Sequence, residues 1–527
     1  MSTVGLVTPS PPAVGTELVR RRVSPPVHRI QKDVLRRRVR IAGWVAFALW
    51  AAGLCLYSTV LYHHFLLGED FGQYNQAWTL IGQGHLDPFN TVYGFPFVRS
   101  NFELVLWPLA FVHLVFPHPI VLLWIQDLSV AGTGLVTYLW VGDILERARV
   151  TLWPTVLVAA GVVIVTVTNP SMYETVAFDF HMEATAALFV VLAARDLWRG
   201  RTTRAWVFVA ITLLCGTFSA VVIVGLGLSA LLAGPRTRRS GILLLVTGVG
   251  WTVLVDLLHV NVGSSISNYA YLAGRSSLVG VGGMVALAGS IAAHPARIVD
   301  QLRHRLSEIW FLIRPYGVIG LASAWGFGVP AVVVVTSSLN SSVNFLEPFQ
   351  NFAALPFLLV GTVIVLIWLS SRFRLGAVLA VLVGIAILTQ ALVWGTAKSS
   401  FDARWFIDRV GQPQAAQLQA ALDKTPANAE VIATIPVMGR FCGRESCQIF
   451  YPDVARPVTN RTVVFVLAPH YEPTTSAIRS ERAITYIHDV LHARTLVDAD
   501  GIAALEWHAP PAMTEVTIPT LSTAAKG

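Results

Sequence analysis

Apolar residues form long continuous stretches between positions 41 and 396, each bounded by polar or basic residues. A helix needs about 20 apolar residues to cross a lipid bilayer. By this measure the sequence predicts membrane spans at 41–62, 119–142, 151–168, 183–198, 240–259, 351–371 and 375–396. Residues 104–116 are apolar but too short to cross, which predicts an interfacial or re-entrant segment within the loop 63–118.

Two other apolar stretches predict pairs of short helices rather than single spans. Residues 205–233 have arginine-rich sequence at both ends, so the chain is expected to turn within the membrane, near 215–219. Residues 308–336 contain Pro315 and Pro330, which predicts a second broken pair. With the single spans these give about ten crossings. The predicted fold class is therefore mainly α, a polytopic membrane protein.

The positive charges are concentrated just before the first predicted span, which indicates the topology of the chain in the membrane. Nine basic residues precede the first span: Arg20, Arg21, Arg22, Arg29, Lys32, Arg36, Arg37, Arg38 and Arg40. Excess Lys and Arg marks cytoplasmic segments, so we expect a cytoplasmic N-terminus and an outer loop at 63–118. The net charge of +8 is explained by this placement and does not indicate a nucleic-acid partner. The same arginines can contact anionic membrane lipids.

The chain divides into three regions by composition. Residues 1–40 are rich in Pro, Ser and Arg and predict a disordered cytoplasmic tail, and residues 41–396 form the membrane domain. Residues 397–527 have the periodicity of a small α/β domain. Its helices are predicted at 415–424 and 483–493, and its strands at 431–437, 462–468 and 503–509.

The number of crossings places this last domain outside the cytoplasm, where disulfides persist. Cys442 and Cys447 lie five residues apart across a glycine, so we predict a disulfide between them, with two free thiols as the alternative.

Titratable residues gather at the predicted outer surface of the membrane. Asp179, His181 and Glu183 alternate at the mouth of a span, where charge is costly. A histidine beside carboxylates can bind a metal or a phosphate, or move a proton. The ordinary alternative is helix capping by the two acids.

The first outer loop opens with another acidic pair, Glu69 and Asp70. Adjacent carboxylates can bind a divalent cation or act as a general base, although acids also commonly begin a solvated loop. We therefore expect a metal site, for Mg²⁺ or Mn²⁺, at Asp70, Asp179, His181 and Glu183. An arginine in the same loop can hold a phosphate. The candidate substrate contacts are Gln73, Gln76, Arg99 and Glu103.

Three segments of the chain carry a family resemblance: GEDFGQYNQAW at 68–78, SNFELVLWPLAFVHLVFPHPIVLLWIQDL at 100–128, and NPSMYETVAFDFHMEA at 169–184. They resemble a bacterial family of predicted polytopic membrane proteins of unknown function, over roughly residues 57–510. That family is similar in layout to the GT-C superfamily of glycosyltransferases, which use polyprenyl-phosphate sugars as donors.

The resemblance implies an enzyme of the bacterial cytoplasmic membrane. It would take a sugar from a polyprenyl-phosphate donor and pass it to an acceptor on the outer face of the membrane. Asp70 would be the catalytic acid residue, as base or metal ligand, with Glu69 beside it. The lipid-linked sugar would be the partner, and a divalent metal the cofactor.

The sequence departs from the family pattern in two places. The pattern has a histidine before Phe-Ser-Pro where this chain has residues 101–103, and charged residues where this chain has the turn 215–219. Because of these departures, a second interpretation stays open, in which the protein is not catalytic and binds lipid-linked sugar or supports assembly. A transporter or flippase is a third interpretation, because it shares broken helices. An enzyme requires Asp70, Glu103 and His181 to line one outward cavity.

Overall fold

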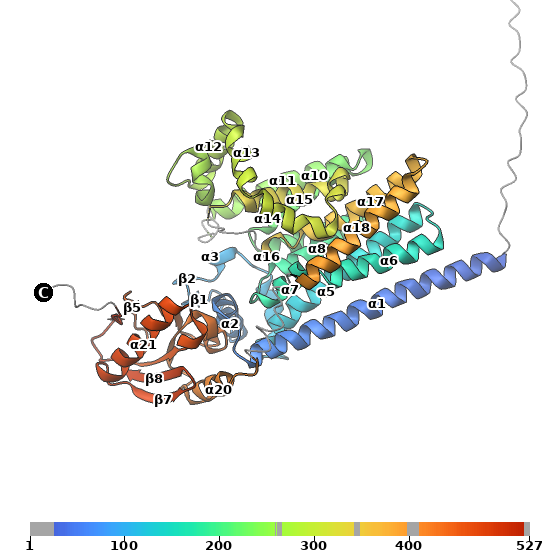
Figure 1. Ribbon diagram of the computed structural model, residues 1–527. Coiled ribbons are helices and arrows are strands. Elements are labelled where there is room, and N and C mark those ends of the chain that lie inside the picture. Colours follow the sequence, from blue (N-terminus) through green and yellow to red (C-terminus); the bar gives the residue numbers. More distant parts are fainter. Residues whose placement is uncertain (1–25, 259, 261–265, 342–347, 398–409, 521–527) are drawn as a thin grey trace, which may run out of the picture.

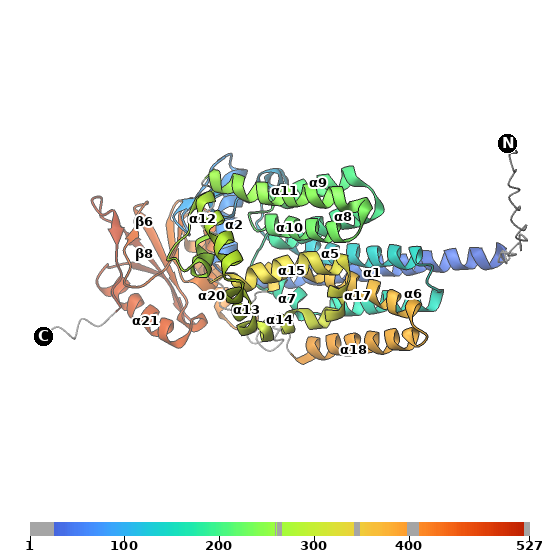
Figure 2. The same ribbon diagram turned by 90° about the horizontal axis from the view of Figure 1, so that it is seen from above.

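A computed structural model describes residues 26–258, 260, 266–341, 348–397 and 410–520 of the chain. The described residues form a helical domain, and a small α/β domain covers one end of it (Figures 1 and 2). The predicted fold class is thereby confirmed. The long helices run roughly side by side, and α1 extends past the others at the end away from the α/β domain (Figure 1).

The helical domain has the following elements in chain order. They are α1 (Pro26–His63), α2 (Glu69–Gly82), β1 (Phe89–Asn90), β2 (Phe95–Pro96), α3 (Val98–Asn101), α4 (Leu106–His113), α5 (Ile120–Arg147), α6 (Leu152–Val167), α7 (Pro170–Ala177), α8 (Glu183–Arg199), α9 (Thr202–Leu214), α10 (Ser219–Leu232), α11 (Pro235–Leu257), η1 (Ile266–Ala273), α12 (Gly280–Ala293), α13 (Pro295–His304), α14 (Leu306–Ile313), η2 (Arg314–Tyr316), η3 (Val318–Ala322), α15 (Ala324–Leu339), α16 (Pro348–Asn351), α17 (Ala354–Arg372) and α18 (Gly376–Ala397).

Among the described residues, six helical segments are long and apolar enough to cross a membrane: Val34–His63, Ile120–Arg147, Leu152–Ala177, Pro235–Leu257, Ala354–Arg372 and Gly376–Val393. Shorter apolar helices are Thr202–Leu214, Ser219–Leu232, Gly280–Ala293 and Ala324–Leu339. The described residues thus contain six candidate spans where about ten crossings were expected. The predicted span 183–198 folds as α8, a helix of 17 residues with charged residues in its last turns, which is in neither set.

The short pair predicted at 205–233 is present as α9 and α10, which turn at residues 215–218. Gly216 has φ of +129° in this turn, a backbone conformation that residues other than glycine rarely adopt. The second pair is also broken near Pro315, by η2 and η3. Pro330 was expected to break the chain but lies inside α15, so that part of the prediction is wrong.

The expected disordered tail at 1–40 needs a correction at its C-terminal boundary. Helix α1 begins at Pro26, and residues 1–25 lie outside the described part of the chain. Proline is favoured at the first helical position, and the Leu, Arg and Lys residues that follow are good helix formers. From Pro26 onward, the basic segment is therefore the N-terminal part of the first membrane helix and not a coil that precedes it.

The α/β domain contains helices α20 (Gln414–Lys424) and α21 (Thr474–Asp489), and the 3₁₀ turns η4 (Ile435–Cys442) and η5 (Pro469–Tyr471). Its main sheet consists of β3 (Glu430–Ala433), β4 (Cys447–Ile449), β6 (Thr462–Leu467), β7 (Arg494–Ala499) and β8 (Ile502–His508), in the order β4-β3-β6-β8-β7. Strands β5 (Arg456–Pro457) and β9 (Glu515–Val516) pair separately.

Strands β4, β3 and β6 are parallel, and β8 is antiparallel to both β6 and β7. The five apolar residues of β6 after Thr462 are all buried, as expected for a central strand covered on both faces. The three predicted strands are present as β3, β6 and β8, although residues 435–437 belong to a 3₁₀ turn. The sequence did not predict β4 and β7, which lie at the sheet edges.

Helices α10 and α15 approach each other through facing glycines. A Cβ atom added to Gly225 would lie 2.7 Å from the Cα of Val329, and one added to Gly328 would overlap the backbone of Ser229. Close helix packing through small residues is common in membranes, where no hydrophobic effect drives helices together. The packing of α10 against α15 therefore leaves no room for a side chain at either glycine.

We predict that Gly328→Ala destabilises the helical domain by about 1–3 kcal/mol, because the methyl group forces α10 and α15 apart. The control is Gly250→Ala in α11, where an added Cβ meets nothing within 4 Å. Thermal unfolding of the purified protein in detergent compares the two. Equal melting temperatures for both variants would contradict the proposed glycine contact.

Candidate functional site

Helix α2 begins with Glu69 and Asp70, and its first turn is held by a residue far along the chain. The backbone N–H of Gly68 donates a hydrogen bond of 2.7 Å to Oδ1 of Asp179, across a sequence separation of 111 residues. Asp179 has φ of +49°, in the left-handed region, which turns its side chain toward α2. Asp179 therefore fixes the start of α2.

The segment that carries Asp179 and His181 is held by Gln126, a fully buried residue of α5. The side-chain amide of Gln126 donates to the carbonyls of Thr175 (3.1 Å) and Asp179 (2.9 Å). Its carbonyl accepts a bond of 2.5 Å from the N–H of His181. Sequence reasoning missed Gln126. The available signal was an amide side chain inside an apolar span, where polar groups are costly and usually have a role.

His181 lies between two carboxylates. Its Nε2 is 3.7 Å from Oδ2 of Asp70, and its Nδ1 is 3.9 Å from Oε2 of Glu183. The imidazole also stacks on the ring of Phe178, with 5.4 Å between ring centroids. The structure thus brings together Asp70, His181 and Glu183, as the sequence suggested, and Asp179 lies beside them.

The expected metal ligands do not surround a single point. Opposite nitrogens of His181 face Asp70 and Glu183, so one ion at either nitrogen reaches only one of those carboxylates. Asp179 already accepts a bond from Gly68. No group of three His, Cys, Asp or Glu side chains within the described residues is arranged to hold a metal ion. The four-ligand site is therefore not assembled in this arrangement, and the metal requirement stays a prediction.

Tyr74 connects this cluster to Glu103. Its hydroxyl donates a hydrogen bond of 2.6 Å to Oε1 of Glu103, and both side chains are buried. Burial, together with the carboxylates of Glu103 and Glu183, raises the pKa of Tyr74. Glu103 is only 2% exposed, so in this arrangement it does not line an outward cavity with Asp70 and His181, and its role as a direct substrate contact stays a prediction. Through its hydrogen bond with Tyr74, Glu103 instead holds α2 against the rest of the domain.

Gln73 and Gln76 were expected to contact substrate, and both are engaged with the protein. Gln73 donates to Oδ1 of Asp70 at 3.4 Å and accepts from Asn90 at 3.2 Å. The amide of Gln76 donates to the carbonyls of Arg444 (3.1 Å) and Glu445 (2.9 Å). Gln73 therefore orients Asp70, and Gln76 holds the α/β domain. Both amides are buried, and their role as substrate contacts stays a prediction.

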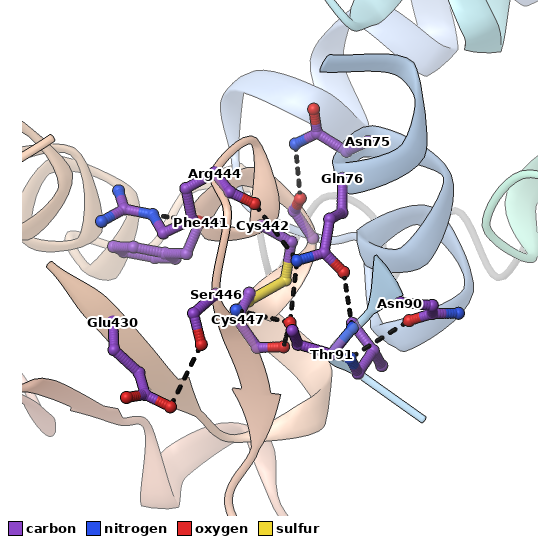
Figure 3. The surroundings of a disulfide bond; sticks show 12 residues. Asn75, Gln76, Asn90, Thr91, Glu430, Phe441, Cys442, Arg444, Ser446 and Cys447 are labelled. Atoms are coloured by element: carbon purple, nitrogen blue, oxygen red, sulfur yellow. Dashed lines mark hydrogen bonds between the residues drawn. A yellow bond between two sulfur atoms is a disulfide. The ribbon is translucent and has the colours of Figure 1, made fainter. Parts of the chain in front are cut away.

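The loop that Gln76 contacts is closed by the predicted disulfide, Cys442–Cys447, which the structure confirms (Figure 3). Two further contacts join this loop to the membrane domain. Asn75 donates to the carbonyl of Gly439 at 2.9 Å, and the hydroxyl of Thr91 pairs with the backbone of Cys447 at 2.8 Å (Figure 3). We call residues 439–447 with their contacts to α2 and Thr91 the interdomain clasp.

Two tyrosines flank the acidic pair on its exposed side. The hydroxyl of Tyr93 lies 3.4 Å from Oδ1 of Asp70, and its ring stacks on Phe95. Tyr451 belongs to the α/β domain. The guanidinium group of Arg456 stacks over its ring, with 4.5 Å between Cζ and the ring centroid. Burial and the carboxylate of Glu69 raise the pKa of Tyr451. Sequence reasoning missed both tyrosines, because nothing local links position 451 to position 69.

The predicted phosphate ligand Arg99 is exposed at the surface, in α3. Its neighbour Ser100 donates to Oε1 of Gln73 at 3.4 Å, and Gln73 in turn contacts Asp70. Arg99 is therefore next in sequence to a residue that contacts Gln73, and its side chain is accessible to a ligand.

The electrostatics of the site favour protonated acids near neutral pH. Burial and then the charge of Asp70 raise the pKa of Glu69 to about 7. The same two causes, in the same order, raise the pKa of Asp179 to about 7. A carboxyl group that changes protonation near neutral pH can accept or donate a proton during a reaction.

Comparison with known proteins identifies the family of the chain. The profile described as "Predicted membrane protein (DUF2079)" matches residues 62–484, so the chain belongs to that family. The family resemblance drawn from the sequence is thereby confirmed. No curated protein matches the sequence.

One solved structure with a related arrangement is described as "Crystal Structure of ArnT from Cupriavidus metallidurans in the apo state". The match covers 88% of this chain and 98% of that one, at 12% identity and a TM-score of 0.44. Similarity at this level does not carry a function from one chain to the other.

We predict that Gln76→Ala loosens the interdomain clasp. Removing a buried donor and acceptor leaves backbone groups of Arg444, Glu445 and Thr91 without their partners, which costs about 1–3 kcal/mol. Amide hydrogen exchange of residues 439–447 should accelerate about tenfold. Gln83→Ala, an exposed glutamine beyond the end of the same helix, is the control. Unchanged exchange in Gln76→Ala would refute the clasp.

We also predict that stability falls as pH rises from about 4 to 7. Asp179 keeps its proton up to about pH 7 in the folded protein but loses it near pH 4 when unfolded. The folded state therefore binds more protons in this window, and raising the pH destabilises it. Melting temperatures measured across this range should fall less steeply in Asp179→Asn, while the exposed Asp300→Asn keeps the original slope. An unchanged slope in Asp179→Asn would exclude this effect.

Proposed function

We propose that this member of the family is a membrane glycosyltransferase that transfers a sugar from a polyprenyl-phosphate donor to an acceptor hydroxyl at the outer face of the cytoplasmic membrane. The observation that carries the proposal is the convergence of Asp70 with His181 at the end of the membrane helices. These residues come from separate segments and lie 3.7 Å apart, next to the covering α/β domain.

Asp70 is the proposed general base. Its Oδ1 faces Gln73 and Tyr93, each at 3.4 Å, and its Oδ2 faces His181. This arrangement fixes the carboxylate while leaving it 25% exposed. A base held in one orientation and still reachable from solvent is suited to take a proton from a bound hydroxyl.

The reaction replaces one carbon–oxygen bond at the anomeric carbon with another and moves one proton. The acceptor oxygen gives its proton to Asp70 and attacks the anomeric carbon of the donor sugar. The bond between that carbon and the phosphate oxygen breaks, and the lipid phosphate leaves with the electron pair. Arg99 is the proposed contact for the departing phosphate, because a guanidinium group can bind two phosphate oxygens at once.

The position of the site suits a lipid-linked donor. A polyprenyl chain partitions into the bilayer, which keeps the attached sugar phosphate at the membrane surface. The acidic pair follows the long apolar helix α1 directly, so it stands where such a head group would lie. The partly exposed rings of Tyr93 and Tyr451 offer flat apolar faces beside the acids, and the apolar face of a sugar ring can pack on such surfaces.

A non-catalytic binding protein is the second candidate, and one observation favours it. The turn between α9 and α10 is uncharged, and its Leu214 carbonyl accepts a bond of 2.9 Å from the N–H of Val105. Buried Cys215 therefore lies close to Glu103, where the resemblance leads us to expect charged residues. In this alternative the chain binds the lipid-linked sugar without turnover.

We predict that Asp70→Asn lowers the release of lipid phosphate from polyprenyl-phosphate sugars by about 10²–10⁴-fold, the usual contribution of a general base. The assay uses purified protein in lipid, with and without Mg²⁺ or Mn²⁺, and so tests the expected metal as well. Asp87→Asn is the matched control, since Asp87 is an exposed acid of the same loop.

Binding of the donor without turnover would favour the non-catalytic alternative. Neither binding nor turnover with any polyprenyl-phosphate sugar would reject the lipid-sugar proposal and favour a transport assay. Turnover that survives in Asp70→Asn would remove Asp70 from the proposed reaction.

A further inference from the structure

A second polar site lies at the opposite end of the helical domain from the acidic pair. A cavity of about 240 Å³ opens between the ends of α1, α5 and α6. Three arginines of α1 line it, Arg36, Arg37 and Arg40, together with a single acid, Glu146. The remaining wall is largely apolar and includes Leu145 and Leu152.

The charges around this cavity are unbalanced. Arg40 donates to Glu146 at 2.9 Å, and Arg36 lies 3.9 Å from the same carboxylate. The other nearby acid, Asp143, is already paired with Arg195 at 2.9 Å and Arg199 at 2.7 Å. Three guanidinium groups, those of Arg36, Arg37 and Arg40, therefore line the cavity beside the single carboxylate of Glu146, which leaves an excess of two positive charges for an anionic ligand.

The cavity lies at the level of the lipid head groups. Helix α1 has 38 residues and is roughly 57 Å long at 1.5 Å per residue, against a hydrocarbon core of about 30 Å. Its arginine-rich N-terminal part must therefore extend out of the core. Trp44 and Trp153, on α1 and α6, are 54% and 75% exposed, and tryptophan is typical of the membrane interface.

We infer that this cavity binds the head group of an anionic phospholipid. The arginines pair with the phosphodiester, and the apolar wall receives the first part of the acyl chains. The hydroxyl of Tyr138 donates to the carbonyl of Val39 at 2.7 Å. This bond joins α1 to α5 beside the cavity and fixes the spacing of the two helices that line it. This site is independent of the proposed glycosyltransferase activity.

The test is native mass spectrometry of the full chain in detergent, titrated with phosphatidylglycerol or phosphatidylcholine. We expect one tightly retained phosphatidylglycerol and much weaker retention of phosphatidylcholine. The double variant Arg36→Gln/Arg37→Gln should weaken phosphatidylglycerol binding about thirtyfold, from about 1 kcal/mol per arginine. The control Arg236→Gln/Arg238→Gln removes the same charge from the start of α11 and should bind as the unmodified protein does.

A second variant separates lipid binding from general charge effects. Gly142 lines the cavity, and an added Cβ there meets nothing within 4 Å. Gly142→Leu should therefore narrow the cavity, where at least its Cβ has room, and prevent lipid binding while every arginine remains. Equal losses in the cavity and control arginine variants, or full binding by Gly142→Leu, would overturn the inference. Displacement of the lipid by an equal concentration of glycerol 3-phosphate would overturn the lipid assignment.

Discussion

The interdomain clasp is the contact on which the proposed site depends. Asn75 and Gln76 lie on the helix that begins with Glu69 and Asp70, and both side chains bond to backbone carbonyls of the α/β domain. The disulfide Cys442–Cys447 closes the loop that supplies the contacts to Gln76. Most residues of α2 are buried, and the hydrogen bonds to this loop and to Asp179 fix its orientation within that packing.

The same arrangement explains how residues far apart in sequence come to share one site. Gln126, inside α5, fixes the backbone on both sides of Phe180 and so positions Asp179 and His181. Asp179 then fixes the first turn of α2, and Asp70 faces His181. The contacts of Gln126 and Asp179 are hydrogen bonds between buried or partly buried groups, and an unpaired group of that kind would be costly in an apolar domain.

The sequence predicted much of the fold, because apolar length and basic flanks are strong signals in a membrane protein. The short pair α9–α10 and the disulfide Cys442–Cys447 followed from these signals. The start of α1 did not, because a basic, proline-rich segment has the composition of a coil.

For the site, the sequence pointed to Asp70 and His181 by their chemistry and their place beside apolar spans. It could not show which side of α2 faces the α/β domain, so it did not predict the bonds from Gln76 to that domain. Strands β4 and β7 were missed for a related reason. Short edge strands have a weak local pattern and depend on partners elsewhere in the chain.

The central claim is that a lipid-linked sugar binds at the acidic end of α2, between the membrane helices and the α/β domain. Photoaffinity labelling tests it most directly, with a polyprenyl-phosphate sugar that carries the photoreactive group on the sugar. The full chain is labelled in lipid and the adducts are mapped by mass spectrometry. The account predicts adducts within residues 68–103, 178–183 and 447–456. Adducts confined to α13–α15, or to the arginine-lined end of α1, would contradict it.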